Sequence, residues 1–322
     1  MSSNILVSVI VPTYNHQKYI QQCLQGIVAQ QTNFNFEIIV GDDFSTDSNR
    51  EKIMEIVIKH PGKFKILFHN KNLGPKEFPG KNNSIECVKA ATGKYLAFCE
   101  GDDYWTDKSK LQKQADFLEQ NPDYNLCYHK VAVTTENEEI VFNAADEGTP
   151  KDTTTIKDLL ANGNYIHTPS VFYRNPFVKD FPNWYYKMSA GDFALYLLAV
   201  KDKKIKFLPE TMAVYHVHSQ GQWGAKSHVE NYKKEIKSLL VILEPFAEYK
   251  QIICNAIYDR YLSIAGEYRT NGDAAETLKI ELKTMMFCLR SGFQPKRNHF
   301  GLAMNVIKDY FTHKLKTKPT RA

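Results

Sequence analysis

The 322-residue sequence lacks a membrane-spanning segment, because no stretch approaches about 20 consecutive apolar residues. Met1–Asn4 has no basic start, and the apolar run Ile5–Val11 is too short for a signal peptide and leads into a proline. The six cysteines are scattered and form no Cys-x-x-Cys pair, which argues against a zinc site and a disulfide framework. These absences predict a cytoplasmic protein with reduced thiols.

Glycine is missing from Pro12–Asn15, the loop after the first predicted strand. A nicotinamide-dependent dehydrogenase needs a Gly-x-Gly-x-x-Gly turn after a strand. A nucleotidyltransferase usually has a glycine-rich, arginine-containing phosphate loop at the same point. Both enzyme classes are therefore disfavoured.

Charge is divided unevenly along the chain. Residues 1–225 contain 24 Lys and Arg against 26 Asp and Glu, whereas residues 226–322 contain 17 against 10. An acidic part followed by a basic part predicts two regions with different tasks. No nucleic-acid-binding motif accompanies the basic residues, so nucleic acid is not an expected partner.

The first half alternates apolar runs with segments of helical period, which is typical of an α/β sheet with parallel strands. Ile5–Val11 is almost continuously apolar, as expected for a central strand that is covered on both faces. Residues 136–165 are polar and predict an irregular surface excursion, and the pattern from about residue 228 onward is helical. Further strands are expected at Phe36–Val40, Phe64–Phe68, Lys94–Cys99, Leu126–Thr135, Val171–Tyr173, Ile205–Leu208 and Met212–Val217.

Paired carboxylates follow two of these strands, as Asp42-Asp43 and Asp102-Asp103. Ligands bind at the carboxyl ends of strands in an open α/β sheet. Four carboxylates at one edge repel one another unless a divalent cation or a hydrogen-bonding ligand compensates them. An Asp after a strand is also a common cap of the next turn or helix. Because caps need not be doubled, the two pairs favour a ligand site.

Four segments resemble family-two glycosyltransferases, in the family's order and spacing. The resemblance covers about the first 125 residues, weakens to about residue 225 and is absent beyond. It implies a GT-A fold and the transfer of a sugar from a nucleotide diphosphate to an acceptor hydroxyl, with inversion. The segments are Val7–Asn15, Glu37–Asp47, Asn72–Gly74 and Ala91–Trp105.

The resemblance therefore predicts a mixed, mainly parallel, nucleotide-binding sheet flanked by helices. Residues 1–225 are expected to form the GT-A domain, with a nucleotide-binding half over residues 1–125 and an acceptor-binding half over residues 126–225. Residues 226–322 are expected to form a C-terminal helical region.

The resemblance assigns the nucleotide pocket to residues near the first strand ends. Pro12, Tyr14 and Asn15 match positions that line the pocket, where the tyrosine ring stacks on uracil. Asp43 matches the carboxylate that accepts a hydrogen bond from the base N–H, which favours uracil over cytosine and leaves thymine open. Lys81 stands where the family commonly has arginine and would neutralise phosphate as a point charge. A solvated surface lysine is the alternative.

Glu100-Gly101-Asp102-Asp103 matches the family's Asp-x-Asp element, with Glu in place of the first Asp. By this resemblance Asp102 faces the ribose or the metal, and Asp103 ligates the Mg²⁺ or Mn²⁺ that bridges the diphosphate. Hard cations prefer oxygen ligands. His218 aligns with a family histidine that approaches the diphosphate or metal, with a structural histidine as the alternative. His216 replaces the family's arginine, which favours a structural role for it.

Asp192 falls where the family has its general base, although Gly191 replaces the acid that often precedes it. One carboxylate suffices to take the acceptor's proton in an inverting transfer. A helix N-cap is the alternative. Trp105, Trp223 and Glu100 are candidates for contacts with the sugar or acceptor, and core packing is the alternative for the tryptophans.

The expected partners are a nucleotide-sugar donor, with UDP favoured, and a glycan or lipid-linked saccharide acceptor of bacterial surface polysaccharide synthesis. Residues 308–322 contain five Lys and Arg and one Asp. Such a basic end predicts peripheral contact with the inner face of an anionic membrane, and a solvated terminus is the alternative. A degenerate transferase fold that serves as a scaffold is the non-enzymatic alternative, against which Asp43, Asp102, Asp103 and Asp192 argue.

Overall fold

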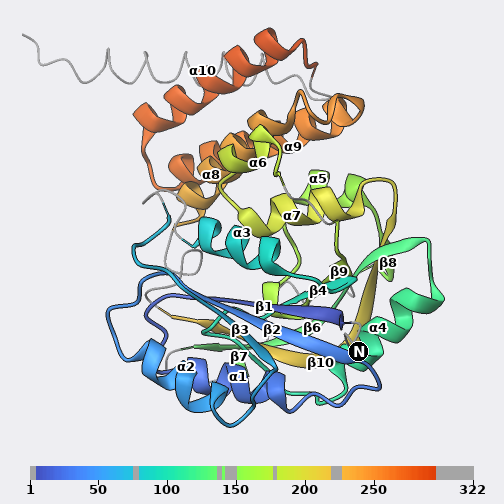
Figure 1. Cartoon of the computed structure of the whole chain (residues 1–322). Helices are drawn as coiled ribbons and strands as arrows, with labels where there is room; N and C mark the ends of the chain where they lie inside the picture. Colours follow the sequence, from blue (N-terminus) through green and yellow to red (C-terminus); the bar gives the residue numbers. More distant parts are fainter. Residues whose placement is uncertain are drawn as a thin grey trace, which may run out of the picture. The chain divides into compact units, whose positions relative to one another are not determined.

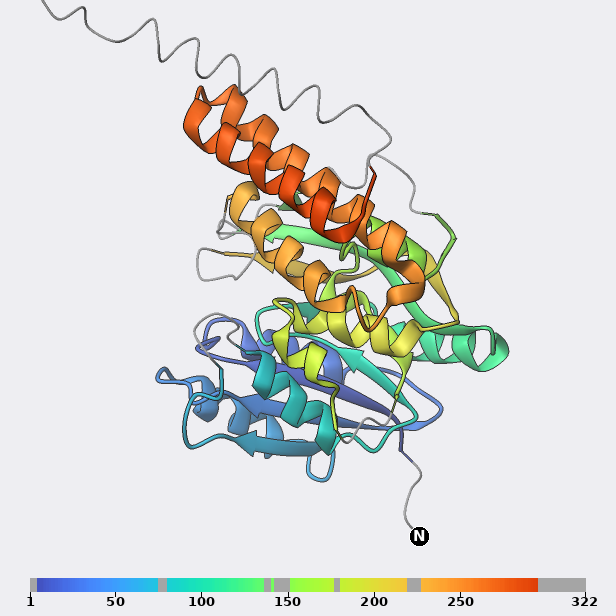
Figure 2. The same cartoon turned by 90° about the horizontal axis from the view of Figure 1, so that it is seen from above.

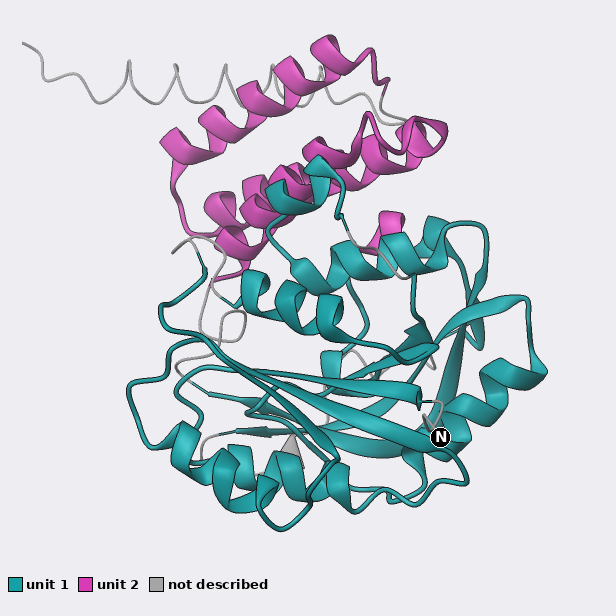
Figure 3. Ribbon diagram, in the orientation of Figure 1, with its two compact units in different colours: residues 1–159, 164–225 teal, residues 160–163, 226–322 magenta. Residues whose placement is uncertain are grey.

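The computed structural model describes residues 5–74, 80–135, 140–141, 151–176, 180–218 and 227–294. The chain divides into two compact units (Figure 3), one of residues 1–159 and 164–225 and the other of residues 160–163 and 226–322. Trp223 and the basic segment 308–322 lie outside the described residues.

Ten strands form one mixed sheet in the described part of the first unit (Figure 1). They are β1 (Ile5–Thr13), β2 (Asn35–Asp42), β3 (Phe64–Phe68), β4 (Tyr95–Phe98), β5 (Tyr104–Trp105), β6 (Tyr124–Thr135), β7 (Ile140–Val141), β8 (Thr153–Thr154), β9 (Phe172–Arg174) and β10 (Lys204–Val217). Their order is β3-β2-β1-β4-β9-β6-β10-β5, with β7 beside β6 and β8 beside β10. Strands β3, β2, β1 and β4 are parallel, as are β6 and β10, whereas β9 is antiparallel to β4 and β6.

Helices cover both faces of this sheet, as Figure 1 shows, with α1 and α2 on one face and α3 and α7 on the other. This confirms the predicted mixed, mainly parallel sheet flanked by helices. The described residues form the helices α1 (Ile20–Val28), α2 (Asn49–Val57), α3 (Lys81–Ala90), α4 (Lys110–Gln120), α5 (Ile156–Asn162), α6 (Asn183–Lys187), α7 (Gly191–Val200), α8 (His228–Ile242), α9 (Lys250–Thr270) and α10 (Ala274–Ser291), with 3₁₀ turns at Thr168–Ser170 and Ala247–Tyr249.

Strand β1 lies between β2 and β4 and is buried on both faces. Its alternate residues Val7, Val9 and Val11 belong to the same core as Ile20 and Leu24 of α1. The residues that alternate with them, Ser8 and Ile10, point to the opposite face of the strand. Helix α3 packs on β1 and β2. A continuously apolar sequence is needed here because both faces exclude water.

The second unit is helical in its described residues, and α9 packs along both α8 and α10. Figure 2 shows α9 and α10 lying side by side. Helix α8 begins with a capping box between Ser227 and Glu230, and α10 begins with Asp273 accepting from the Glu276 N–H. Gly292, with φ of 67°, ends α10 in the left-handed conformation that glycine favours. Among the described helices, none is long and apolar enough to cross a bilayer.

The predicted break between Ile205–Leu208 and Met212–Val217 is wrong, because β10 continues through it. The pairing of β10 with β6 shifts register between Leu208 and Thr211 and again between Thr211 and Ala213. Pro209 and Glu210 interrupt the apolar pattern there, and a bulge accommodates a proline that cannot donate to the sheet.

The expected irregular excursion is also wrong over Ile156–Asn162, which form α5. Ile156, Leu159 and Leu160 are buried at helical spacing. The Asp158 carboxylate accepts from the backbone N–H and the hydroxyl of Thr155 just before the helix. Three apolar positions were too few to stand out from the polar residues around them.

Asp42, at the end of β2, is fully buried and satisfied by three donors. Its carboxylate accepts from the Ser45 N–H (3.0 Å), the Asn49 side-chain amide (2.8 Å) and Arg50 Nε (2.5 Å). Burial alone would raise the pKa of Asp42, but the hydrogen bonds from Ser45, Asn49 and Arg50 outweigh it and lower the pKa. Asp42 therefore fixes the loop after β2 to the start of α2.

We expect Asp42→Asn to lower the free energy of unfolding by about 3 kcal/mol at neutral pH, because Arg50 loses its buried partner. The folded-state pKa of Asp42 lies below its unfolded value of about 3.9, so this stability is complete above that value and is lost as pH falls through the folded-state pKa. Urea unfolding near neutral pH and near pH 2 measures both effects. Glu51→Gln, on exposed α2 surface, is the control. Equal stability of Asp42→Asn and wild type at neutral pH would contradict the prediction.

Candidate active site

Two backbone hydrogen bonds hold the acidic loops against the end of β1. The Asp43 N–H donates to the Thr13 carbonyl and the Gly101 N–H donates to the Pro12 carbonyl, both at 3.0 Å. A Cβ at Gly101 would lie 2.4 Å from Thr13 Oγ1, so this close approach requires glycine. The loops after β1, β2 and β4 therefore meet at one edge of the sheet.

The loop after β1 brings Pro12, Tyr14 and Asn15 to this edge. Pro12 is buried, whereas Tyr14 leaves 42% of its surface exposed beside it. Asn15 has φ of 55°, a left-handed conformation that asparagine tolerates. Its N–H donates to Ser45 Oγ (2.9 Å) and its side-chain oxygen accepts from the Thr46 N–H (2.8 Å). Asn15 thus ties this loop to the one after β2 and leaves the Tyr14 ring accessible.

Asp43 is buried with one carboxylate oxygen unused. Oδ1 accepts from the Leu73 N–H at 2.7 Å, while Oδ2 has no hydrogen-bond partner among the described residues. Burial raises the pKa of Asp43. The next residue, Phe44, has φ of 65°, which is strained for a non-glycine residue. A buried acceptor without a donor is rare in folded proteins and points to a missing ligand group.

Glu100, Asp102 and Asp103 bring carboxylate oxygens within 4.8 Å of one another. Asp103 Oδ1 accepts from the His216 N–H at 2.9 Å, whereas Asp103 Oδ2 and Asp102 Oδ1 lack partners in the described structure. Burial and the neighbouring carboxylates raise the pKa of Asp103 well above its usual value. Burial, with the charges of Asp102 and Asp192, raises the pKa of Glu100 to about 8. The negative charges of these three carboxylates are therefore not fully compensated by neighbouring positive groups among the described residues.

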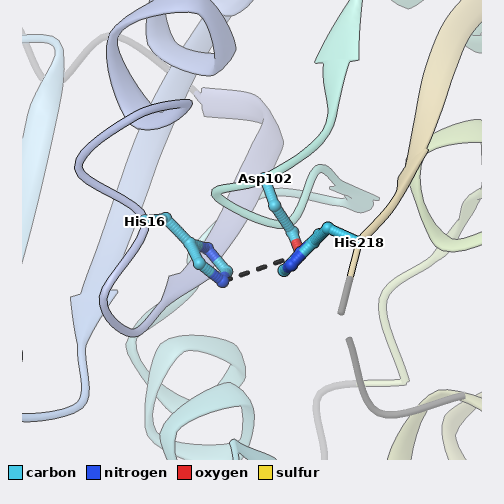
Figure 4. Close-up of side chains that lie close together, drawn as sticks. All are labelled: His16, Asp102 and His218. Carbon is cyan, nitrogen blue, oxygen red and sulfur yellow. Dashed lines mark hydrogen bonds and ion pairs between the residues drawn. The ribbon is translucent and has the colours of Figure 1, made fainter. Parts of the chain in front are cut away.

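Two histidines approach Asp102 from different segments, as Figure 4 shows. His218, from the residue after β10, places Nε2 at 2.9 Å from Asp102 Oδ2. His16, from the loop after β1, places Nε2 at 3.6 Å from the same oxygen. Burial would raise the pKa of Asp102, but the two imidazoles outweigh it and the pKa is lowered. His218 was predicted from the sequence and His16 was missed, although its place after a strand end was the available signal.

The donor set at this edge suits a divalent cation. Oxygen ligands come from Asp102 and Asp103, both with an unused oxygen, and an imidazole nitrogen comes from His218. Carboxylates and imidazole are the usual ligands of Mg²⁺, Mn²⁺ and related ions. A cation would also relieve the repulsion that raises the pKa of Asp103.

Asp192 lies in the first turn of α7, one residue inside the helix rather than at its N-cap, which is Ala190. Its Oδ1 accepts from the Phe193 N–H (2.7 Å) and its Oδ2 from the Asn164 side-chain amide (2.6 Å). Burial raises its pKa. A carboxylate offers about four acceptor positions, so Asp192 keeps capacity to accept a proton, and its charge acts on Glu100.

Lys81 is buried, and its ammonium donates to three backbone carbonyls. These belong to Tyr185 (2.7 Å), Tyr186 (2.9 Å) and Met188 (2.8 Å). Its three donors are thus engaged in holding the start of α3 to the end of α6 and to the residue that follows it. A phosphate contact from Lys81 would require these hydrogen bonds to break. The alternative of a solvated surface lysine also does not apply, because the side chain is buried.

Trp105 lies in the hydrophobic core and leaves only 4% of its surface exposed. Its Nε1 donates to the Pro169 carbonyl at 2.9 Å, and Lys110 Nζ lies 4.0 Å from the ring centroid. The ring therefore offers no open face to a sugar, and core packing is the correct alternative for Trp105. Trp223 lies outside the described residues.

This sheet order, with acidic loops at the carboxyl edge, defines a GT-A fold. The chain belongs to glycosyl transferase family 2, whose family model matches residues 8–190.

Two known proteins, one of them also compared through its crystal structure, show how far the similarity extends. An uncharacterised protein of Mycobacterium tuberculosis is 36% identical over 222 residues, which are 67% of this chain and 60% of that protein. The poly(ribitol-phosphate) beta-N-acetylglucosaminyltransferase TarS of Staphylococcus aureus is 28% identical over 292 residues, covering 86% of this chain and 46% of that protein. The crystal structure of TarS residues 1–349 in complex with UDP aligns with a TM-score of 0.57 and 25% identity, covering 84% of this chain and 75% of that one. The chain thus spans about half to three fifths of these curated relatives.

We expect Asp103→Asn to stabilise the metal-free protein, because asparagine keeps the oxygen that accepts from His216 and removes the repelled charge. The raised pKa means that ionisation of Asp103 costs stability as pH rises above the unfolded value of about 3.9. The gain should be about 1 kcal/mol, or about 3 °C in melting temperature, at pH 8 in EDTA, and should vanish near pH 4. Thermal melts at the two pH values test this. A variant that melts below wild type at pH 8 would show that the ionised Asp103 carboxylate does not destabilise the metal-free protein.

Proposed function

We propose that this chain transfers a sugar from a UDP-sugar to an acceptor hydroxyl, with inversion at the anomeric carbon. The observation that carries the proposal is a set of buried oxygens of Asp43, Asp102 and Asp103 at one edge of the sheet, which have no hydrogen-bond partner among the described residues. They occur in a family-2 glycosyltransferase fold that is similar to TarS, whose structure was determined with UDP.

The uracil base is bound between Tyr14 and Asp43 in this proposal. The exposed Tyr14 ring offers a face for stacking, and Asp43 Oδ2 accepts a hydrogen bond from uracil N3–H. The opposite oxygen of Asp43 is already fixed by the Leu73 N–H, so the carboxylate cannot rotate freely. A charge-assisted hydrogen bond in a buried site contributes about 1.5–3 kcal/mol.

The diphosphate lies beyond the base, next to Asp102, Asp103 and His218. These residues would hold a divalent cation, which when bound stabilises the negative charge of the departing UDP. The chain's own contribution is to keep three ligands fixed before the donor arrives. The His216 N–H orients Asp103, and the His218 imidazole orients Asp102.

Asp192 is the general base of the transfer. The acceptor oxygen attacks the anomeric carbon as its proton passes to Asp192, and the bond from that carbon to the β-phosphate oxygen breaks with its electron pair going to UDP. The raised pKa makes Asp192 a stronger base than an ordinary aspartate. Hydrogen bonds from Asn164 and Phe193 fix its orientation.

The acceptor is a glycan or polyol-phosphate chain of a bacterial surface polysaccharide. The support is the similarity to TarS, which is named for poly(ribitol-phosphate) as its acceptor and N-acetylglucosamine as its sugar.

A melting screen with UDP, GDP, dTDP and CMP, each with Mn²⁺ and with EDTA, tests the donor class. We expect UDP with Mn²⁺ to raise the melting temperature, since a ligand that binds only the folded state stabilises it, and Asp103→Asn to abolish the response. We also expect Asp43→Asn to weaken UDP binding at least about tenfold and to improve binding of CDP relative to UDP. The asparagine oxygen still accepts from Leu73, and its amide N–H₂ then meets cytosine N3, an acceptor.

Isothermal titration of UDP and CDP into both proteins measures this exchange, with Glu51→Gln as control. No response of the folded wild type to any nucleotide would favour the scaffold alternative. If Asp43→Asn binds UDP and CDP with the same relative affinity as wild type, the nucleobase does not contact Asp43.

We expect Asp192→Asn to reduce kcat by about 10²–10⁴-fold while keeping the melting response to UDP and Mn²⁺. In wild type, kcat should fall as pH drops through a pKa above the usual value of about 3.9, because protonated Asp192 cannot act as a base. Transfer to a ribitol-phosphate polymer from a panel of UDP-sugars measures kcat, and Asp202→Asn, on the exposed turn after α7, is the matched control. Equal kcat in wild type and Asp192→Asn would assign the base to another residue.

A further inference from the structure

His16, Asp102 and His218 have the composition of a site for two imidazoles and one carboxylate. One imidazole nitrogen of each histidine and one Asp102 oxygen all lie within 4.8 Å of one another. The three residues come from three separate segments, the loop after β1, the loop after β4 and the end of β10. In Figure 4 both rings turn a nitrogen toward the same carboxylate.

The spacing of these atoms fits one ion. With metal–ligand bonds of about 2.1 Å, ligand atoms stand about 3.0 Å apart at right angles and about 3.4 Å apart at tetrahedral angles. The observed distances to Asp102 Oδ2 are 2.9 Å from His218 and 3.6 Å from His16. Both distances to Asp102 Oδ2 are therefore close to those expected between ligands of one ion.

The surroundings hold the three side chains in place. Side-chain exposure is 4% for His218, 16% for Asp102 and 17% for His16. The glycine at position 101 lets His16 lie close, because a Cβ there would stand 2.9 Å from His16 Nδ1. The His16 and His218 rings meet edge to face, 6.1 Å between centroids.

Asp103 is the less available of the two aspartates. It leaves 1% of its surface exposed, and one of its oxygens already accepts from the His216 N–H. Asp102 has a free Oδ1 in addition to the oxygen that faces the histidines. Asp102 belongs to two groups of neighbouring ligand atoms, one with His16 and His218 and one with Glu100 and Asp103. We infer that the two imidazoles, rather than the Glu100 carboxylate, complete the ligand set of the ion.

We propose that His16 is a further ligand of the cation in the UDP-sugar site, beside Asp102, Asp103 and His218, and that this cation is a first-row transition ion rather than Mg²⁺. This inference rests on the proposed function. Imidazole nitrogen binds Co²⁺, Ni²⁺ and Zn²⁺ well, whereas Mg²⁺ prefers a shell of oxygen. Mn²⁺ accepts both ligand types, and four protein ligands leave two positions of a six-coordinate ion for diphosphate oxygens.

Pulsed electron paramagnetic resonance of the Mn²⁺–UDP complex tests the ligand directly. We expect nitrogen modulation from two imidazoles in wild type, from one in His16→Gln, and from two in the control His216→Gln, whose ring lies 5.4 Å from that of His218. Protein labelled with ¹⁵N-histidine assigns the modulation to histidine. The wild-type spectrum alone decides the question if His16→Gln does not fold.

Competition titrations supply a second measurement. In the presence of UDP, wild type should bind Co²⁺ more tightly than Mg²⁺, and His16→Gln should lose about 10–100-fold of Co²⁺ affinity with little change for Mg²⁺. Mn²⁺–UDP binding with one imidazole nitrogen in both wild type and His16→Gln would overturn the role of His16 and leave the proposed function standing. Absence of any Mn²⁺–UDP complex in folded wild type would instead overturn the proposed function, and this inference with it.

Discussion

The last two carbonyls of β1 accept the N–H groups of Gly101 and Asp43, and the placement of the acidic side chains follows from these two bonds. They bring the loops after β2 and β4 to the end of one buried central strand. The approach is close enough that position 101 tolerates no Cβ. Because the parallel strands β2, β1 and β4 all end at the same edge, their loops need no further element to converge.

Asp42 and Asp43 show how adjacent residues of one strand end divide stability and binding between them. Alternation along the strand turns Asp42 toward Asn49 and Arg50, where donors satisfy it and its pKa falls. Asp43 turns the other way, keeps an unpartnered oxygen, and its pKa rises. In the neighbouring loop, burial and nearby carboxylates likewise raise the pKa of Asp103. A folded protein tolerates such uncompensated charge at a site where a ligand supplies the missing donors.

Two residues that resembled ligand contacts serve the scaffold instead. Lys81 holds the start of α3 to carbonyls at the end of α6, and Trp105 fills the core beneath the acidic loop. Both lie next to the site, so their packing positions the residues that face it. His16 is the converse case, since a residue with no assigned task approaches Asp102.

The sequence by itself determined the sheet class, the order of its acidic loops and the family, because apolar runs, strand-end carboxylates and spacing are local signals. It failed at β10, where Pro209 and Glu210 conceal one continuous strand, and at α5, where only three apolar positions mark the helix. Whether Lys81 and Trp105 are exposed or engaged, and whether His16 meets His218 at Asp102, was decided only by the tertiary structure. Those facts depend on contacts between residues about 60 to 200 positions apart, and such contacts leave no periodic trace in the chain.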